Sequence, residues 1–224
     1  AKIPPTLTFL RIIIGYDEKD AQSLMNIISH QTNLEILRLN HMLGLKLDFH
    51  TFQPLTNLQT LYISTTNYPD ILPPLPLLET LVFKLKGYVL KDDWDPTEMP
   101  PIPLNLNSDW STDFPSLTRF GMKGHCHYEW AEQLGLILPT QLTSLHLEFK
   151  GGTPFAYPVE PAGFLAKLKQ MTQLTYVDLG DFWDCATIVE LSCAPHWPLM
   201  RMDPFQYILV CIEPEELPMP MVPY

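Results

Sequence analysis

Positive charge is scarce in this chain. Of its 224 residues, 14 are Lys or Arg and 25 are Asp or Glu, which gives a formal net charge of −11. A general nucleic-acid binder, or a protein that docks on anionic lipid, needs clustered cations to meet phosphate. The charge balance therefore argues against both functions.

Long apolar runs, glycines and paired cysteines are also missing. The longest apolar stretches, such as LGLIL and YILVCI, are far shorter than the roughly 20 residues that span a bilayer. The 10 glycines form neither a phosphate-binding loop nor a Gly-x-Ser-x-Gly motif. The 4 cysteines form no Cys-x-x-Cys pair, so neither a zinc knuckle nor a dense disulfide framework is expected. No Asn begins an Asn-x-Ser/Thr site, which favours a cytoplasmic or nuclear location.

A short leucine template recurs along the chain. TNLEILRLN, which begins at Thr32, and TNLQTLYIS, which begins at Thr56, place apolar residues at the same offsets, as Leu-x-x-Leu-x-Leu and Leu-x-x-Leu-x-Ile. Seven copies begin at Leu7, Leu34, Leu58, Leu78, Leu117, Leu142 and Leu174. The shortest interval runs from Leu58 to Leu78, and the longest runs from Leu78 to Leu117. Such repetition predicts a stack of similar structural units.

Each copy predicts one short strand. Alternate side chains of a strand share a face, so the fourth and sixth positions point into a core and the residues between them point out. Copies stacked in parallel would form one continuous core. Residues 20–31, 128–138 and 161–171 have helical spacing, whereas the returns after Leu39 and Ile63 are short and are expected to be extended or single-turn. We therefore expect an α/β fold, with a curved parallel sheet and mixed helical and extended returns.

The seven copies resemble the leucine-rich repeat superfamily. Their variable lengths, helical returns and openings such as FPSLTRF resemble, more specifically, the C-terminal repeat domains of fungal F-box proteins. The Asn or Cys usual three positions after the last strand leucine is absent from most copies. The resemblance implies a leucine-rich repeat solenoid over residues 1–198 with a loop insertion at 87–113. Residues 199–224 would form a degenerate eighth repeat or a cap, followed by a Pro-rich acidic tail.

The same resemblance implies a non-catalytic protein–protein interaction module. In F-box proteins the repeats are the substrate-recognition part of a ubiquitin ligase receptor, and an N-terminal F-box contacts the ligase adaptor. No F-box is visible in the chain, so that contact would need a region before Ala1. The first copy has no polar cap and would also need cover from such a region.

The outward strand positions would line the concave face of the solenoid. They carry five cations and two anions, namely Arg11, Arg38, Lys84, Arg119 and Lys123 against Glu148 and Asp178. This reverses the sign of the whole chain, and we expect an acidic or phosphorylated protein segment as partner. Folding of the acidic insertion over the stripe is the alternative. The predicted partner contacts are Arg11, Arg38, Tyr62, Lys84, Arg119, Lys123, His146 and Tyr176 on the strands, with Trp94 and Trp110 in the insertion.

Two other classes of function stay open. A structural subunit or scaffold of a larger complex would show the same repeats. A hydrolytic or metal-dependent enzyme has less support: His146 and Asp178 from neighbouring copies would form an acid–base pair without a nucleophile in place. His125 and His127 in GHCHYEW lack the second ligand pair of a structural zinc site. The acidic run DDWDPTE lacks the glycine of a calcium-binding loop. We expect no catalytic, metal or cofactor site.

Overall fold

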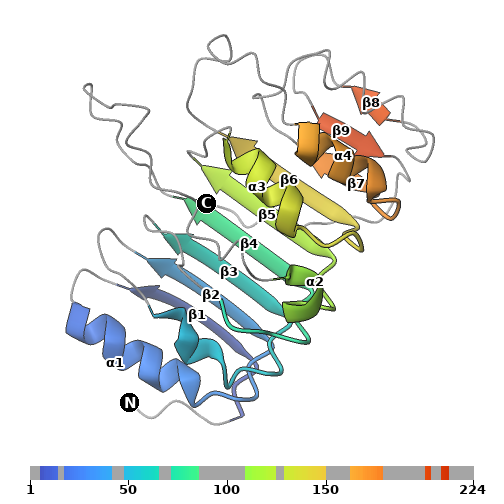
Figure 1. The fold of residues 1–224 in the computed structure, drawn as a ribbon. Coiled ribbons are helices and arrows are strands. Elements are labelled where there is room, and N and C mark those ends of the chain that lie inside the picture. The colour runs from blue at the N-terminus through green and yellow to red at the C-terminus, as the bar shows by residue number, and fades with distance from the viewer. Residues whose placement is uncertain are drawn as a thin grey trace, which may run out of the picture.

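The computed structural model of this chain describes residues 6–14, 18–41, 48–65, 72–85, 109–124, 129–149, 162–178, 200–202 and 208–211. These residues form a sheet and several helices (Figure 1). Seven strands lie side by side in the order of the sequence, and each pairs in parallel with the next. They are β1 (Phe9–Ile14), β2 (Ile36–His41), β3 (Thr60–Thr65), β4 (Thr80–Leu85), β5 (Arg119–Gly124), β6 (Ser144–Phe149) and β7 (Tyr176–Asp178). The predicted α/β fold with a parallel sheet is confirmed.

The leucine template accounts for the core. Leu34, Leu37 and Leu39, the three template positions of the second copy, are each 0 % exposed. The equivalent residues of the next four copies are also buried, with Phe83, Phe120 and Met122 replacing some of the aliphatic side chains. Burial of one such side chain contributes about 1.5 to 3 kcal/mol relative to exposure. In β1, which ends the sheet, Leu10 and Ile12 are only partly buried.

A tight turn precedes β2, β3, β4, β5 and β7 and fixes where each of these strands begins. The N–H of Leu58 donates to the carbonyl of Leu55 at 3.0 Å, closing such a turn. The next two N–H groups, of Gln59 and Thr60, both donate to the carbonyl of Glu35 in the preceding copy, at 2.8 and 2.9 Å. The same double donation occurs at all six junctions between β1 and β7. The turn and the backbone ladder therefore set the register together.

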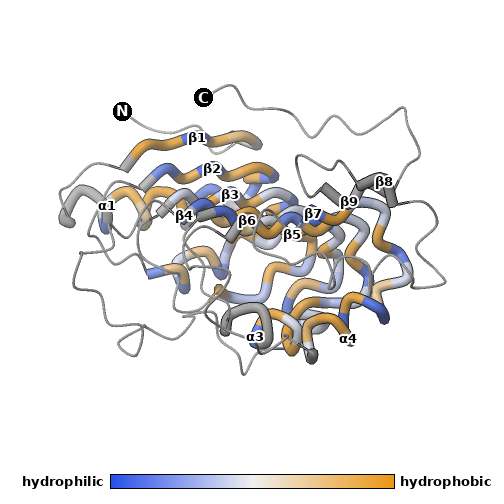
Figure 2. The backbone as a smooth tube through the Cα atoms, turned by 90° about the horizontal axis from the view of Figure 1, so that it is seen from above, coloured by the Kyte–Doolittle hydropathy of each residue, from blue (hydrophilic) through white to orange (hydrophobic). Residues whose placement is uncertain are grey.

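One face of the sheet is covered by α1 (Glu18–Ser29), the single turn η1 (Phe49–Phe52), α2 (Trp110–Asp113), α3 (Glu129–Ile137) and α4 (Ala162–Gln170) (Figures 1 and 2). The three predicted helices are confirmed, and η1 agrees with the single turn expected after Leu39. Apolar side chains of these elements, such as Met25, Phe52 and Leu168, belong to the same buried cluster as the strand leucines. No helix of the described residues is long and apolar enough to cross a membrane. We call the other side of the sheet, which no described helix covers, the open face.

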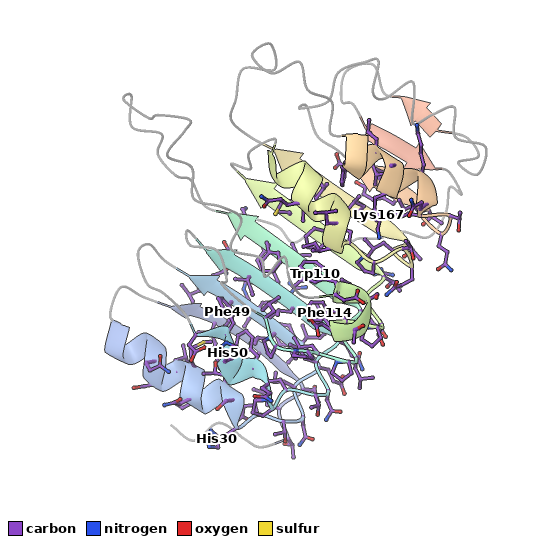
Figure 3. The ribbon with its side chains drawn as sticks, viewed as in Figure 1. His30, Phe49, His50, Trp110, Phe114 and Lys167 are labelled. Carbon is purple, nitrogen blue, oxygen red and sulfur yellow. The ribbon has the colours of Figure 1, made fainter. Side chains whose placement is uncertain are left out.

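Trp110 corrects the predicted bounds of the insertion. The prediction placed it in an exposed loop at 87–113, but its side chain is 2 % exposed and lies beside Phe114 on the helix-covered face of the sheet (Figure 3). Its ring packs edge to face against Phe114 and Phe120, with 5.4 Å between centroids in both pairs. Asp109 caps α2 by accepting hydrogen bonds from the N–H and hydroxyl of Ser111. Trp110 is therefore a core residue and not an exposed anchor for a partner, whereas Trp94 lies outside the described residues.

The strands after residue 199 do not extend the parallel series. β9 (Ile208–Cys211) pairs antiparallel with β7, and β8 (Met200–Met202) pairs antiparallel with β9. An eighth parallel copy beginning at Leu199 is therefore not what these described residues form. The alternative, a cap that covers the end of the sheet, stays a prediction.

Candidate functional site

The strand register builds the candidate site on the open face. The fifth template positions of the seven copies align across the sheet as Arg11, Arg38, Tyr62, Val82, Gly121, His146 and Asp178. We call this set the central row. Neighbouring strands are about 4.8 Å apart, so adjacent side chains of the row are within reach of one another. The row has a basic end on β1 and β2 and a His–Asp end on β6 and β7.

The basic end holds two arginines side by side. Arg11 and Arg38 are Cα partners, with Arg11 exposed and Arg38 partly exposed. Arg119, on the neighbouring row, is also exposed. Within the described part of the chain, no hydrogen bond or ion pair engages any of these three guanidinium groups. Two like charges one strand apart repel by roughly 1 kcal/mol in water, which an anion placed between them would relieve.

The cations in the middle of the open face are less available to a partner. Lys84 and Lys123 are Cα partners, but both are partly buried and already engaged in interactions, as is Tyr62. Gly121 contributes no side chain to the central row. A Cβ added there would meet Val82 Cγ2 at 3.4 Å, so Val82 fills that space. The two lysines predicted as partner contacts are on the expected face. Arg11 and Arg119 are more exposed than these lysines, whereas Arg38 is partly buried, as the lysines are.

The other end of the row is a compact polar cluster. His146 Nδ1 lies 2.6 Å from Asp178 Oδ2, and the two side chains are 11 % and 14 % exposed. Tyr176 Oη donates to the same carboxylate oxygen at 3.4 Å. Burial of the phenol, with the Asp178 charge and this hydrogen bond, raises the pKa of Tyr176 to about 12. The predicted proximity of His146 and Asp178 is confirmed.

This cluster links residues of β6 and β7. His146 as a whole is 9 % exposed, so little of its surface is open to a partner, and its predicted contact with a partner stays a prediction. An acid–base group that works on a substrate needs access to the reacting atoms. The His146–Asp178 pair, which joins neighbouring strands, is nearly buried and offers little such access.

A polar groove at the edge where the strands begin was not predicted. It encloses about 450 Å³ and is lined by Thr6, Thr8, Asn33, Glu35, Asn57, Gln59 and Leu77. Within it, Asn57 Nδ2 donates to the carbonyl of Thr32 at 2.9 Å, across neighbouring copies. The repeated Thr-Asn before two strands was the available signal, and Asn57 links the turns of two copies.

No group of three or more His, Cys, Asp or Glu side chains that could hold a metal ion occurs among the described residues. His125, Cys126 and His127 lie outside the described residues, and their lack of a metal role stays a prediction. Glu148 is a Cα partner of Lys123 in the register. The cations of the central and neighbouring rows that no described residue engages thus lie on β1, β2 and β5.

No protein-family model matches the sequence, and comparison with curated proteins finds no match either.

Proposed function

We propose that the chain is a leucine-rich repeat solenoid whose open face binds a protein segment rich in carboxylate or phosphate. The seven template copies and their seven parallel strands in sequence order support the repeat architecture. In such an architecture, outward strand residues form one extended surface on a rigid support. Binding without catalysis is therefore the proposed activity.

The single observation that carries the proposal is the pair Arg11–Arg38. The two guanidinium groups are aligned in register, and no described residue neutralises them. Each guanidinium can make two parallel hydrogen bonds to a carboxylate or phosphate, a geometry that lysine lacks. A local basic site in a chain of formal charge −11 also steers an acidic partner to this face and repels it elsewhere.

In a cell, such a module would select a substrate for a ubiquitin ligase, as the resemblance to F-box repeat domains implies. That role adds an acidic or phosphorylated degradation signal as the bound segment. The rival role, a fixed subunit of a larger assembly, predicts co-purification at constant stoichiometry. A receptor would instead release its partner and exchange it.

A peptide array tests the proposed function. Each spot carries the same backbone sequence with glutamate, phosphoserine, serine or lysine at two central positions. We expect the wild-type chain to bind the glutamate and phosphoserine spots and to lose binding as salt rises. Arg11→Glu with Arg38→Glu should cost about 2 kcal/mol or more, which is roughly a thirty-fold loss of affinity. The double variant should bind the glutamate and phosphoserine spots no more tightly than it binds the lysine spots.

The matched control reverses two charges on the covered face. Lys167→Glu with Lys169→Glu, in α4, changes the net charge of the chain by the same amount and leaves the open face unaltered. Equal weakening by both double variants would show that net charge, not the open face, governs binding. Arg11→Lys with Arg38→Lys separates charge from bidentate geometry, since it keeps the charge and removes the planar group. Circular dichroism checks that every variant is folded.

A further inference from the structure

Strand β1 ends the sheet, and its outward side chains are exposed. Phe9 is 47 % exposed and Ile13 is 66 % exposed, with exposed Arg11 between them. In Figure 2, β1 is the outermost strand of the parallel series and is coloured as hydrophobic over most of its length. Monomeric proteins rarely leave a long apolar edge strand open. An edge strand whose outward side chains run apolar, cationic, apolar is therefore an unusual surface to be covered by solvent alone.

The backbone of the same three residues faces the free edge. The carbonyl of Thr8 accepts hydrogen bonds from the N–H groups of Glu35 and Ile36, so it points toward β2. In a parallel pair, successive residues alternate between the two edges of the strand. Leu10 and Ile12 therefore bond to β2, whereas Phe9, Arg11 and Ile13 direct N–H and C=O away from it. Among the described strands, none pairs with this edge.

We propose that β1 accepts an extended segment of the partner protein as an additional strand. The segment presents an acidic side chain opposite Arg11, between two apolar side chains opposite Phe9 and Ile13. This inference rests on the proposed function and specifies its binding mode: the backbone supplies affinity, and the three outward side chains select the sequence. The apolar–cationic–apolar order is symmetric about Arg11, so parallel and antiparallel segments satisfy the same rule.

Charge complementarity identifies the occupant. A second copy of β1 paired about the same centre would place Arg11 opposite Arg11, and like charges directly opposite are destabilising. Arg38 lies one strand further in, in register with Arg11, and adds a second positive charge to the same place. An acidic side chain between apolar neighbours meets all three side chains of β1. The proposed occupant is thus a segment of a different protein with an alternating apolar–acidic–apolar pattern, and pairing of β1 with a region of the same chain before Ala1 would overturn the inference.

The probe for this inference is the synthetic peptide TVTETVT, in which the two valines and the glutamate share one face. TVTKTVT and TVETTVT are its controls, because the first reverses the charge and the second moves it to the other face. Binding is followed by fluorescence anisotropy. Nuclear magnetic resonance reports amide exchange of the wild-type chain, and we expect TVTETVT to slow it about tenfold or more at Phe9, Arg11 and Ile13. Exchange at Leu10 and Ile12 should change little, because those amides already bond to β2.

A matched pair of variants separates backbone from side chain. Ile13→Ala and Ile13→Pro both remove the apolar side chain, but only proline removes the outward N–H, which an edge strand tolerates. We expect Ile13→Pro to bind TVTETVT about tenfold more weakly than Ile13→Ala. If the proline variant does not fold, the amide exchange of the wild-type chain decides alone.

The outcomes distinguish this inference from the proposed function. If Arg11→Glu with Arg38→Glu abolishes peptide binding while the Phe9, Arg11 and Ile13 amides stay unprotected, strand addition is overturned and the acidic-segment function stands. Equal binding of TVTETVT and TVETTVT, or none of TVTETVT at millimolar concentration, also overturns strand addition. Self-association in sedimentation that Ile13→Pro removes would assign the edge to a second copy and overturn the inference. Failure of the peptide array would remove both proposals.

Discussion

Helices α3 and α4 approach each other closely at Gly135, which makes Gly135→Ala an informative perturbation. A Cβ placed on Gly135 would lie 2.8 Å from Phe164 Cα, 3.0 Å from Phe164 N and 3.3 Å from Gly163 C. All three are backbone atoms of α4, so no side-chain rotation relieves the contact. The two helices would have to separate by several tenths of an ångström, and the packing of the buried side chains Leu134 and Phe164 would loosen.

Two opposing contributions decide the sign of the effect. Alanine in a helix interior is more favourable than glycine by about 1 kcal/mol. Overpacking a tight site costs typically about 1 to 3 kcal/mol, and the upper part of that range applies where backbone must move. We therefore expect the free energy of unfolding to fall by about 1 to 2 kcal/mol. For a chain of this size, the loss lowers Tm by roughly 2 to 8 °C.

Urea unfolding followed by circular dichroism measures the change. Leu136→Ala is the matched control, because Leu136 is the neighbouring residue of α3 and is 78 % exposed. Its effect should stay within about 0.5 kcal/mol. A Gly135→Ala variant that is as stable as the wild type, or more stable, would refute the close approach of the two helices as the reason for glycine at this position.

Trp110→Ala should destabilise the fold by about 3 to 5 kcal/mol in urea unfolding, because it empties a core site, and a loss below about 1 kcal/mol would contradict its burial. Asp178→Asn should lower the pKa of Tyr176 toward, but not to, its ordinary value of 10.0, because burial remains; absorbance titration at alkaline pH measures this. The free energy of unfolding of the wild type should fall between pH 10 and about 12, since the unfolded chain loses the Tyr176 proton first. Asn57→Ala should lower the free energy of unfolding by about 1 kcal/mol or less, because the hydrogen bond from Asn57 to Thr32 is exposed. Thermal unfolding measures the change, and a larger loss of stability would contradict this expectation.

Much of the fold was predictable because one local pattern carries it. Leu-x-x-Leu-x-Leu combines a turn, a strand and an inward face, so each copy identifies its own strand without knowledge of the others. The pairing of Arg11 with Arg38, and of His146 with Asp178, followed from the same alignment of copies. The open-face positions of these residues needed no information beyond the period of two in a strand.

The residues that escaped prediction depend on contacts between segments distant in the sequence. Trp110 was assigned to the insertion because the interval from Leu78 to Leu117 is the longest between copies. A helix at this position could still have been predicted, because Asp109 is a favourable N-cap residue and Trp110 and Phe114 have helical spacing. The burial of His146 depends on neighbours that the template does not specify. The antiparallel pairing of β9 could not be predicted from the template, because the template carries no information on strand direction after the last copy.

The register of the sheet does not depend on the length of the returns. The interval from Leu58 to Leu78 is much shorter than that from Leu78 to Leu117, yet Tyr62, Val82 and Gly121 remain aligned. Insertions and deletions in the returns therefore leave the alignment of side chains on the open face unchanged. By contrast, one residue gained or lost inside a strand would turn its outward side chains into the core. The chain can therefore gain length in its returns and change the outward side chains of the open face independently, one strand at a time.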